Sequence, residues 1–157
     1  MILDIGSGTP SFYHKRLDLN DVIHADISKT ATHLEIQCSI YNLPFKDNGI
    51  KIIHVCHVLE HLDEPLKAIK EIFRVSKNYA IIKVPNAVYF KWKKESPEHI
   101  FSWNQSTLFN LLTRYFSIVT IEPTQRNIGT SRLKKILYLV ITLFHRKNEL
   151  TAICIKK

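Results

Sequence analysis

Short apolar runs rich in β-branched residues alternate with helical patterns along the 157-residue chain. Four of these runs are almost continuously apolar, which is typical of strands covered on both faces of a sheet. Strands are predicted at 1–5, 22–26, 34–38, 50–56, 79–84, 116–122 and 150–156. Because strands and helices alternate, the sequence predicts an α/β fold with a mostly parallel sheet and helices on both faces.

Helical patterns occur where apolar residues recur at intervals of three and four positions. The stretch 63–75 has Asp63 as a candidate N-cap and Pro65 in its first turn, and both favour a helix start there. A second amphipathic helix is predicted at 104–115. A third, at 131–146, is apolar and has basic residues on both sides. Each of these helices lies between two predicted strands, as an α/β chain requires.

Composition narrows the class of protein. With 45% hydrophobic residues the chain can bury a core, so one domain over 1–157 is predicted. Lys and Arg outnumber Asp and Glu by 22 to 14, and the net charge of +8 suits either an anionic partner or a generally basic surface. The cysteines form no C-x-x-C pair, and the longest apolar run, 136–144, is about half a membrane span. The sequence therefore predicts a cytoplasmic protein.

Two of the four glycines, Gly6 and Gly8, directly follow the first predicted strand, and a short helix is predicted next, at 11–19. Glycine permits a sharp turn and lets a ligand approach the backbone closely. The amides of such a turn and of the helix start then face the ligand. Asp26 ends the second strand, where a nucleoside-binding fold places the acid that accepts the ribose hydroxyls. Together these features favour a nucleoside site over a purely structural turn.

The identity of the nucleoside depends on the residues around the glycines. The third glycine of the dinucleotide fingerprint G-x-G-x-x-G is replaced by Ser11. Asp4, two residues before the first glycine, instead suits a ligand with a cationic head, held directly or through water. The stretch ILDIGSGTP resembles the first motif of class I S-adenosylmethionine-dependent methyltransferases, hydrophobic–D/E–x–G–x–G–x–G, except that Pro10 stands at the last glycine.

Further motifs extend this resemblance to residues 1–125. The stretches NLPF, VLEHL, IIKVPN and HIFSWNQSTLFNLLTRYFSIVTIEP are similar, in this order, to those of the type 11 group of methyltransferases. The resemblance implies a Rossmann-like seven-stranded sheet in the order 3-2-1-4-5-7-6 with strand seven antiparallel. It also implies that the N-terminal helices of the family are missing here, and that helix 131–146 is inserted between strands six and seven.

The resemblance implies S-adenosylmethionine as methyl donor, with S-adenosylhomocysteine as product, and it suggests which residues bind it. The implied contacts are Asp4, Gly6, Ser7 and Gly8 with the methionine half, Asp26 with the ribose, and Ile27, Ser39 and Ile40 with the adenine, while Cys56 and His57 line the methyl-donor pocket. Ser39 stands where the family commonly has an Asp that accepts the adenine amino group. A neutral hydrogen bond is about half as strong as a charged one, so weaker binding is expected.

Two histidines are candidate catalytic residues. His99 lies where many relatives keep a histidine facing the acceptor, and an imidazole with an ordinary pKa near 6.5 suits removal of a proton from a hydroxyl or ammonium acceptor. An exposed loop histidine fits this position equally well. His57, directly after the fourth strand, is the second candidate. In-line methyl transfer needs mainly alignment and exclusion of water, so no strong catalytic residue is required.

The stretch HVLEH also matches an inverted zinc-protease pattern, H-x-x-E-H, at His57, Glu60 and His61. That chemistry needs a long helix that carries both histidines and a third ligand from a later helix. Here a predicted strand ends just before the pattern and Pro65 follows soon after it. No metal site is therefore predicted, and Glu60 is interpreted as tying this loop to the next helix.

The resemblance leaves the acceptor and the partners open. A small-molecule acceptor such as a sugar, a quinone-like or a lipid-linked compound is favoured over RNA or protein, because no RNA-recognition signature is present. A non-catalytic methyltransferase-like subunit is the third alternative. The first strand begins at Met1, so either the protein starts further upstream, or the cofactor site is covered by a second copy, a partner subunit or helix 131–146. Helix 131–146, with its basic ends, could also contact a membrane surface.

Overall fold

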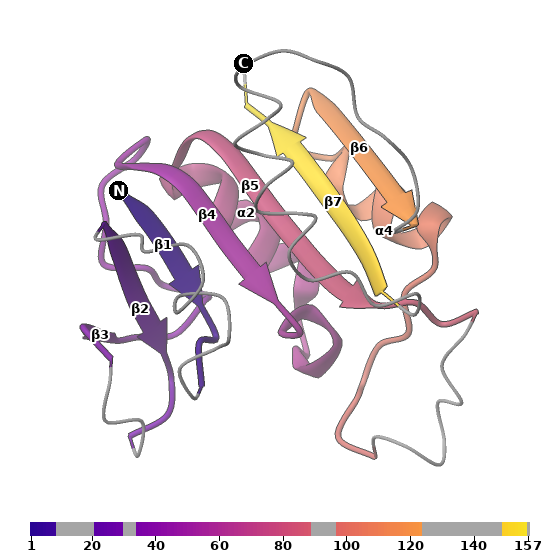
Figure 1. The fold of residues 1–157 in the computed structure, drawn as a ribbon, viewed down its shortest axis with the longest axis horizontal. Helices are drawn as coiled ribbons and strands as arrows, with labels where there is room; N and C mark the ends of the chain where they lie inside the picture. The colour runs from indigo at the N-terminus through magenta and orange to yellow at the C-terminus, as the bar shows by residue number, and fades with distance from the viewer. Residues whose placement is uncertain (9–20, 30–33, 89–96, 124–148, 157) are drawn as a thin grey trace.

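The computed structural model describes residues 1–8, 21–29, 34–88, 97–123 and 149–156. Their strands are β1 Ile2–Ile5, β2 Val22–Asp26, β3 Ile36–Gln37, β4 Ile50–Cys56, β5 Ser76–Pro85, β6 Ile118–Pro123 and β7 Glu149–Ile155. They form one seven-stranded sheet in the order β3-β2-β1-β4-β5-β7-β6 (Figure 1). β7 is antiparallel to β5 and β6, and the other pairs are parallel. The predicted order and the antiparallel last strand are confirmed.

Two strands differ in length from the prediction. β3 has two residues instead of the five predicted at 34–38, since this edge strand pairs only with β2. β5 is longer than the predicted 79–84, because it pairs along most of its length with β4 on one side and β7 on the other. Central strands with two partners extend further than an edge strand with one.

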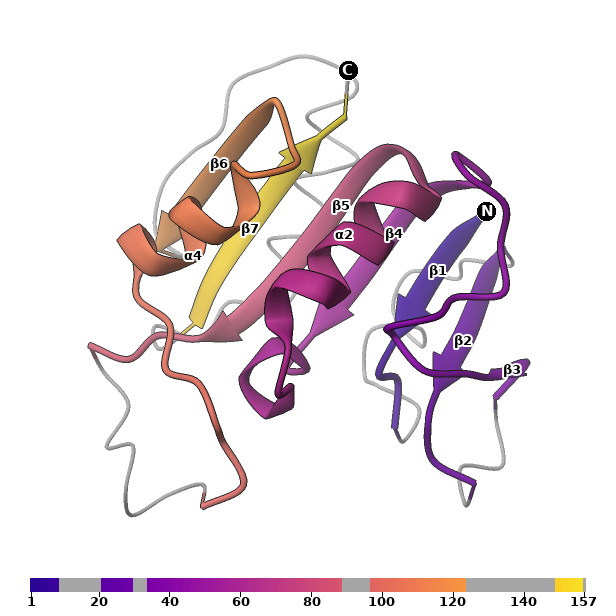
Figure 2. The ribbon, with the colours of Figure 1, turned by 180° about the vertical axis from the view of Figure 1, so that it is seen from behind.

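The described α-helices, α2 at Pro65–Val75 and α4 at Gln105–Leu112, both cover the same face of the sheet (Figure 2). The predicted cap Asp63 is wrong: α2 begins at Pro65, and its N-cap residue Glu64 makes no side-chain cap bond. Before α4, the side chain of Asn104 accepts a hydrogen bond from the amide of Thr107, and the Thr107 hydroxyl accepts one from the amide of Asn104. This reciprocal capping fixes the start of α4.

Two predicted helices, 11–19 and 131–146, lie outside the described residues, and so does the insertion between strands six and seven. Within the described part of the chain, no helix combines the length and the apolar character needed to cross a membrane.

The core lies between the sheet and its two described helices. Its fully buried members include Leu3, Ile53, Val55, Ile82 and Val84 from the sheet, Ala68, Ile69, Ile72 and Val75 from α2, and Leu108 and Leu112 from α4. Fully burying one large aliphatic side chain stabilises a fold by roughly 1.5–3 kcal/mol. The regular spacing of these positions on α2 explains why the sequence pattern located this helix.

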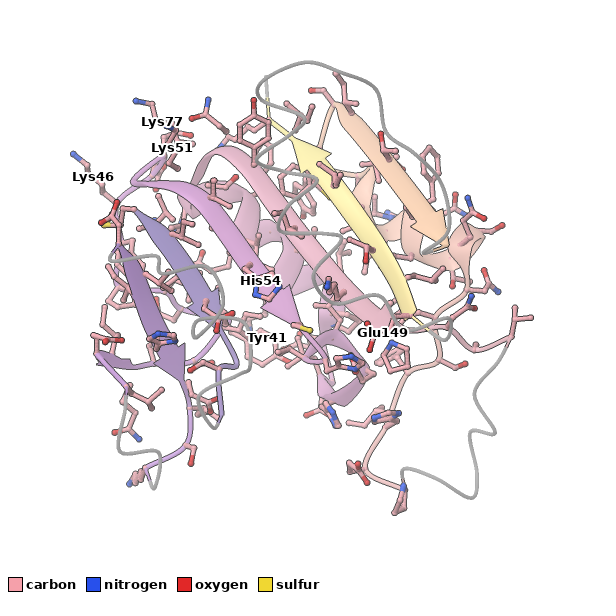
Figure 3. All side chains as sticks on the ribbon, in the orientation of Figure 1. Tyr41, Lys46, Lys51, His54, Lys77 and Glu149 are labelled. Atoms are coloured by element: carbon pink, nitrogen blue, oxygen red, sulfur yellow. The ribbon has the colours of Figure 1, made fainter. Side chains whose placement is uncertain are left out.

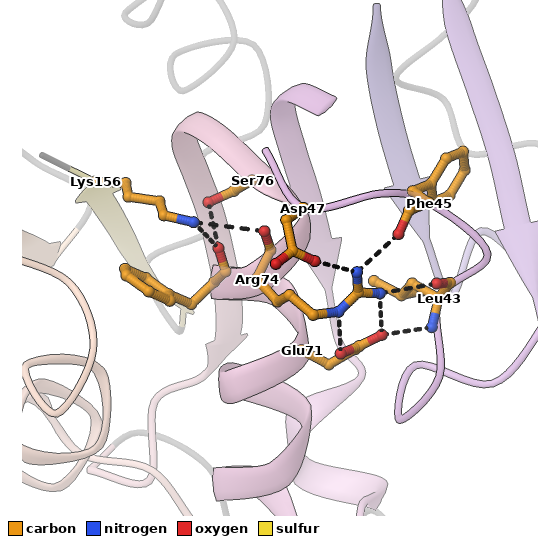
Figure 4. A network of polar contacts seen from close by, with 8 residues as sticks. Leu43, Phe45, Asp47, Glu71, Arg74, Ser76 and Lys156 are labelled. Carbon is orange, nitrogen blue, oxygen red and sulfur yellow. Dashed lines mark hydrogen bonds and ion pairs between the residues drawn. The ribbon is translucent and has the colours of Figure 1, made fainter. Parts of the chain in front are cut away.

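Arg74, near the end of α2, fixes the loop between β3 and β4 (Figure 4). Its guanidinium donates to both oxygens of Glu71 at 2.6 and 2.8 Å, to the carboxylate of Asp47 at 2.8 Å, and to the backbone carbonyls of Leu43 and Phe45 at 3.0 and 2.8 Å. Glu71 in turn accepts from the amide of Leu43 at 2.8 Å. The Arg74 guanidinium therefore fixes the loop between β3 and β4 to the end of α2.

Lys156, directly after β7, closes the other side of this helix end. Its ammonium donates to the carbonyl of Phe73 at 2.6 Å and lies 4.0 Å from the centre of the Phe73 ring (Figure 4). Cations are favourable at helix C-termini, where carbonyl groups lack partners within the helix. The last residues of the sheet are thereby joined to α2.

We expect Arg74→Ala to lower the free energy of unfolding by about 2 kcal/mol, because charged hydrogen bonds contribute roughly 1.5–3 kcal/mol each and the loop carbonyls would lose their donor. Urea unfolding followed by circular dichroism measures this loss. The control is Asp47→Asn, which alters only the exposed carboxylate and should cost less than about 1 kcal/mol. Equal losses in the two variants would show that the exposed ion pair, not the loop carbonyls, matters.

Candidate functional site

A pocket of about 330 Å³ opens at the carboxyl ends of β1, β2 and β4. It is lined by Ile5, Gly6, Asp26, Ile27, Cys38, Ser39, Ile40, Tyr41, His57, Val58, His61 and Leu62. The sheet order reverses between β1 and β4, and open α/β sheets bind ligands at such a reversal. The volume falls within the roughly 300–1,000 Å³ of small-molecule sites.

The turn after β1 requires glycine at two positions. Gly6 and Gly8 have φ values of +73° and +50°, in the left-handed region that other residues avoid. A Cβ on Gly6 would lie 2.2 Å from a methyl carbon of Val58, which follows β4. Around Gly8 no atom lies within 4 Å of such a Cβ among the described residues. Gly6 thus permits close packing across the sheet reversal, whereas Gly8 permits only the turn.

The turn orients the carboxylate at the end of β2. One oxygen of Asp26 accepts a hydrogen bond from the amide of Gly8 at 2.8 Å, and the other accepts one from the amide of Ser28 at 2.9 Å. A carboxylate has about four acceptor positions. Asp26 can therefore accept hydrogen bonds from two further donors, such as the two hydroxyls of a ribose, while it keeps its hydrogen bonds with the amides of Gly8 and Ser28.

Asp4 is buried and does not line the pocket. Its carboxylate lies 2.6 Å from Nδ1 of His54 on β4 and 3.7 Å from Nδ1 of His24 on β2. Asp4 pairs in register with both histidines, so the three side chains stand in one row across three neighbouring strands (His54 is labelled in Figure 3). Sequence reasoning missed this row, although a single histidine within each of two apolar strands was a signal.

Three other predicted cofactor-binding residues, Ser7, Gly8 and Cys56, are also outside the pocket lining. Ser7 is 7% exposed, and its hydroxyl has no hydrogen-bond partner among the described residues. Cys56 ends β4, and burial raises the pKa of its thiol to about 12. A thiol with so high a pKa is neutral at physiological pH and is a poor nucleophile.

The predicted adenine-side residues are brought together in the pocket. The Ser39 hydroxyl accepts from the amide of Tyr41 at 3.3 Å, within a tight turn closed by a bridge between Ser39 and Asn42. Ile40 is buried beside it, whereas the side chain of Ile27 is 71% exposed. An apolar side chain this exposed at a pocket edge is available to cover the face of a ring.

His57 lies in the pocket between two carboxylates. Its Nδ1 is 3.1 Å from Glu60, and its Nε2 is 3.1 Å from Glu149, which is labelled at the start of β7 in Figure 3. Burial alone would lower the pKa of His57, but the hydrogen bonds with Glu149 and Glu60 raise it to about 9. The residue also has a φ of +55°, an uncommon backbone conformation that clusters at functional sites. His57 is thus a cation at neutral pH.

His99 stands beside the pocket and not in its lining. Its ring meets that of His61, which lines the pocket, in an edge-to-face contact with 4.7 Å between the ring centres. Burial lowers the pKa of His99, so the imidazole is neutral at physiological pH. The candidate catalytic residues therefore differ in charge, with His57 cationic and His99 neutral.

Sequence reasoning missed six lining residues: Ile5, Cys38, Tyr41, Val58, His61 and Leu62. Tyr41 comes from the loop after β3, and its hydroxyl accepts a hydrogen bond from the amide of Glu64 at the start of α2. His61 and Leu62 belong to VLEHL, where the 3₁₀ turn η1, Leu59–His61, replaces the long helix of a zinc protease. The VLEHL motif indicated that this segment belongs to the site. Which of its side chains line the pocket depends on the geometry of the 3₁₀ turn, which the sequence pattern does not contain.

The chain matches a known protein family and is similar to several known proteins. The family model described as "Methyltransferase domain" matches residues 3–82. Among curated proteins, the chain is similar to "Uncharacterized protein MJ0638" of Methanocaldococcus jannaschii, with 38% identity over 84 residues. The match covers 50% of this chain and 36% of that protein, so the chain spans about a third of the length of this curated relative.

Among solved structures, the chain is similar to a SAM-dependent methyltransferase from Archaeoglobus fulgidus, with a TM-score of 0.69 and 18% identity. That match covers 99% of this chain and 85% of the other. A second similar structure is a chain in the "Complex between the Haloferax volcanii Trm112 methyltransferase activator and the putative methyltransferase", with a TM-score of 0.68 and 14% identity. That match covers 98% of this chain and 81% of the other. At these identities the likeness establishes the fold.

We expect Gly6→Ala to lower the free energy of unfolding by about 3 kcal/mol, because the left-handed conformation and the contact with Val58 both cost energy. Gly8→Ala is the matched control, with a positive φ but no close neighbour, and should cost about 1–2 kcal/mol. Denaturant unfolding of each variant measures the difference.

Adding Val58→Ala to Gly6→Ala removes the methyl group that the new Cβ meets. A double-mutant cycle should therefore show that the Gly6→Ala cost is smaller in the Val58→Ala background. Two results would contradict this account: Gly6→Ala costing no more free energy than Gly8→Ala, or additive free-energy changes for Gly6→Ala and Val58→Ala. Either result would show that close packing across the sheet reversal is not what requires Gly6.

Proposed function

The chain belongs to the methyltransferase domain family, and from this membership we propose that it transfers a methyl group from S-adenosylmethionine to a small-molecule acceptor. Its sheet is the Rossmann-like sheet of class I S-adenosylmethionine-dependent methyltransferases. The observation that carries the proposal is the hydrogen bond from Gly8 to Asp26, which joins the glycine turn to the pocket-lining acid at the end of β2.

The residues of the pocket fit the nucleoside half of this donor. Asp26 would accept the ribose hydroxyls, since among the described residues each of its oxygens binds one amide and a carboxylate oxygen can accept two donors. Ile27 and Ile40 would pack against the adenine. Ser39 would accept one neutral hydrogen bond from it, which supports an expectation of modest affinity.

The methionine half would lie along the glycine turn. The amides of Gly6 and Ser7 donate to the Ala25 carbonyl and that of Gly8 to Asp26, so the turn would offer an open backbone surface and not free amides. The hydroxyl of Ser7, which has no hydrogen-bond partner among the described residues, lies within the same stretch. Asp4 does not reach the pocket surface, so we assign it an indirect role: its buried charge, paired with His54, would favour the ammonium group at short range. Cys56 is assigned as an apolar neighbour of the methyl-donor end.

The donor supplies an activated methyl group on a sulfonium ion, and the chain's residues would align the acceptor and exclude water. His57 is held between Glu60 and Glu149 at the end of β4, which suits a fixed hydrogen-bond donor better than a base. His99 is the candidate that takes the acceptor's proton, because it stands beside His61 at the pocket rim.

A small-molecule acceptor such as a sugar, a quinone-like or a lipid-linked compound is proposed because the site is a concave pocket of small-molecule size. Within the single domain proposed over 1–157, helix 131–146 stays a predicted insertion and a predicted site of membrane contact. RNA and protein acceptors are alternatives that an activity screen would distinguish.

A partner subunit or a second copy is proposed to cover the open side of the pocket. Ile27, which lines the pocket, is 71% exposed, and Ile100, next to His99 in the chain, is 54% exposed. Exposed apolar groups near a binding site favour coverage by another chain. The similar Haloferax volcanii methyltransferase, in complex with its activator, supports this part of the proposal.

We expect isothermal titration calorimetry to detect S-adenosylmethionine binding, and Asp26→Asn to weaken it at least about tenfold, because a charged acceptor of two hydroxyls becomes a neutral one. Asp21→Asn, which alters the exposed carboxylate just before the same strand, is the matched control and should bind as the wild type does.

Two outcomes would contradict the proposal. No binding at millimolar S-adenosylmethionine would leave the non-catalytic methyltransferase-like subunit as the better description. Binding that survives Asp26→Asn unchanged would show that the ribose does not lie on this carboxylate.

A further inference from the structure

Three side chains with metal-ligating atoms converge at the rim of the pocket. Glu60 and His61 come from η1, and His99 comes from the segment before α4; one ligand atom from each lies within 4.8 Å of the others. Two imidazoles and a carboxylate form a donor set that Zn²⁺ and other divalent first-row metals accept. We infer that Glu60, His61 and His99 form a binding site for a divalent transition-metal ion.

The buried carboxylate of Glu60 is the strongest single observation. Its side chain is fully buried; one oxygen lies 3.1 Å from Nδ1 of His57, and the other has no hydrogen-bond partner among the described residues. A buried polar atom without a partner is costly, and a charged one more so. A cation beside this oxygen would satisfy it.

The two histidines are prepared for the same role. Nδ1 of His61 lies 3.3 Å from the backbone carbonyl of Glu98, so a proton there would donate to the carbonyl and leave the lone pair on Nε2 for a metal. Metal-binding histidines commonly donate their second nitrogen to a carbonyl in this way. His99 is half-buried, and its ring lies edge-to-face against that of His61 with 4.7 Å between the ring centres, so the two rings are close enough to bind one ion.

The ligands come from two distant parts of the chain that the backbone holds together. The carbonyl of Glu60 accepts hydrogen bonds from the amides of Ile100 at 2.7 Å and Phe101 at 3.0 Å. The segment that carries His99 is therefore fastened to η1 before any ion binds. A preformed arrangement lowers the entropy cost of binding.

This donor set differs from the H-x-x-E-H pattern that the sequence analysis set aside. Both ring nitrogens of His57 are within 3.1 Å of carboxylates, from Glu60 and Glu149, so His57 is not a ligand. In the inferred site His99 is the second histidine ligand in place of His57. The contact between His99 and His61 comes from the fold and not from their spacing in the sequence. The prediction of no metal site considered only the ligands that the motif contains.

The inference rests on the proposed function for its chemical role. Three protein ligands leave positions open for water or for an acceptor oxygen, and His61 lines the pocket. For a hydroxyl acceptor, the ion would favour loss of the hydroxyl proton to solvent. The oxygen then bonds to the methyl carbon, while the carbon–sulfur bond breaks and its electron pair stays on sulfur. In this state His99 holds the ion and does not take the proton.

The test is titration of the chelator-treated full chain with Co²⁺ and Zn²⁺, followed by calorimetry and by the visible absorption of Co²⁺. We expect one equivalent to bind to the wild type, and Glu60→Gln, His61→Asn and His99→Asn each to weaken binding at least about tenfold. Asp63→Asn is the matched control: its exposed carboxylate lies two residues after His61 and outside the proposed ligand set, so binding should not change.

The wild type failing to bind either ion, or His99→Asn binding as tightly as the wild type, would overturn the inference. If Glu60→Gln does not fold by circular dichroism, the two histidine variants decide, since neither histidine is fully buried. Calorimetry with S-adenosylmethionine on the same samples separates the two proposals. Metal binding without donor binding would refute the proposed function alone, and donor binding without metal binding would refute this site alone.

Discussion

The close approach of Gly6 to Val58 across the reversal of the sheet is the contact on which the pocket depends. β1 pairs with β2 on one side and β4 on the other, so the segments that follow these strands leave the same edge. With a side chain at position 6, the turn after β1 and the segment after β4 could not meet as they do. The glycine therefore lets the two segments that line the pocket pack together, and the same turn carries the amide of Gly8 that binds Asp26.

Charge in the site is organised as carboxylate–histidine pairs and not as isolated groups. Asp4 is paired with His54 in the sheet, and His57 is placed between Glu60 and Glu149 at its edge. Such pairs let charged groups stay in a half-buried region, because each is stabilised by an opposite or hydrogen-bonded neighbour. The proposed donor, itself a cation with an ammonium group, would bind next to these acids.

Much of the fold and part of the site could be predicted from the sequence, for physical reasons. The strands are apolar runs and α2 has a regular apolar face, so local sequence patterns located them. The glycine turn and Asp26 follow or end neighbouring parallel strands, so their positions in the sequence predicted that they lie close together. The contacts of Asp4 with His54, His57 with Glu149 and His61 with His99 join residues far apart in the chain. They depend on register and turn geometry, which no local pattern contains, and the short β3 reflects its place at an edge.

The central claim is that the nucleoside of S-adenosylmethionine binds over the glycine turn. The most direct measurement is an NMR titration of the ¹⁵N-labelled chain with S-adenosylhomocysteine, followed by the backbone amides. The account predicts the largest shifts at Gly6, Gly8 and Ile40 and small shifts on the distant helix residue Phe109. Shifts confined to α4 and β6, or none at a saturating concentration, would contradict it.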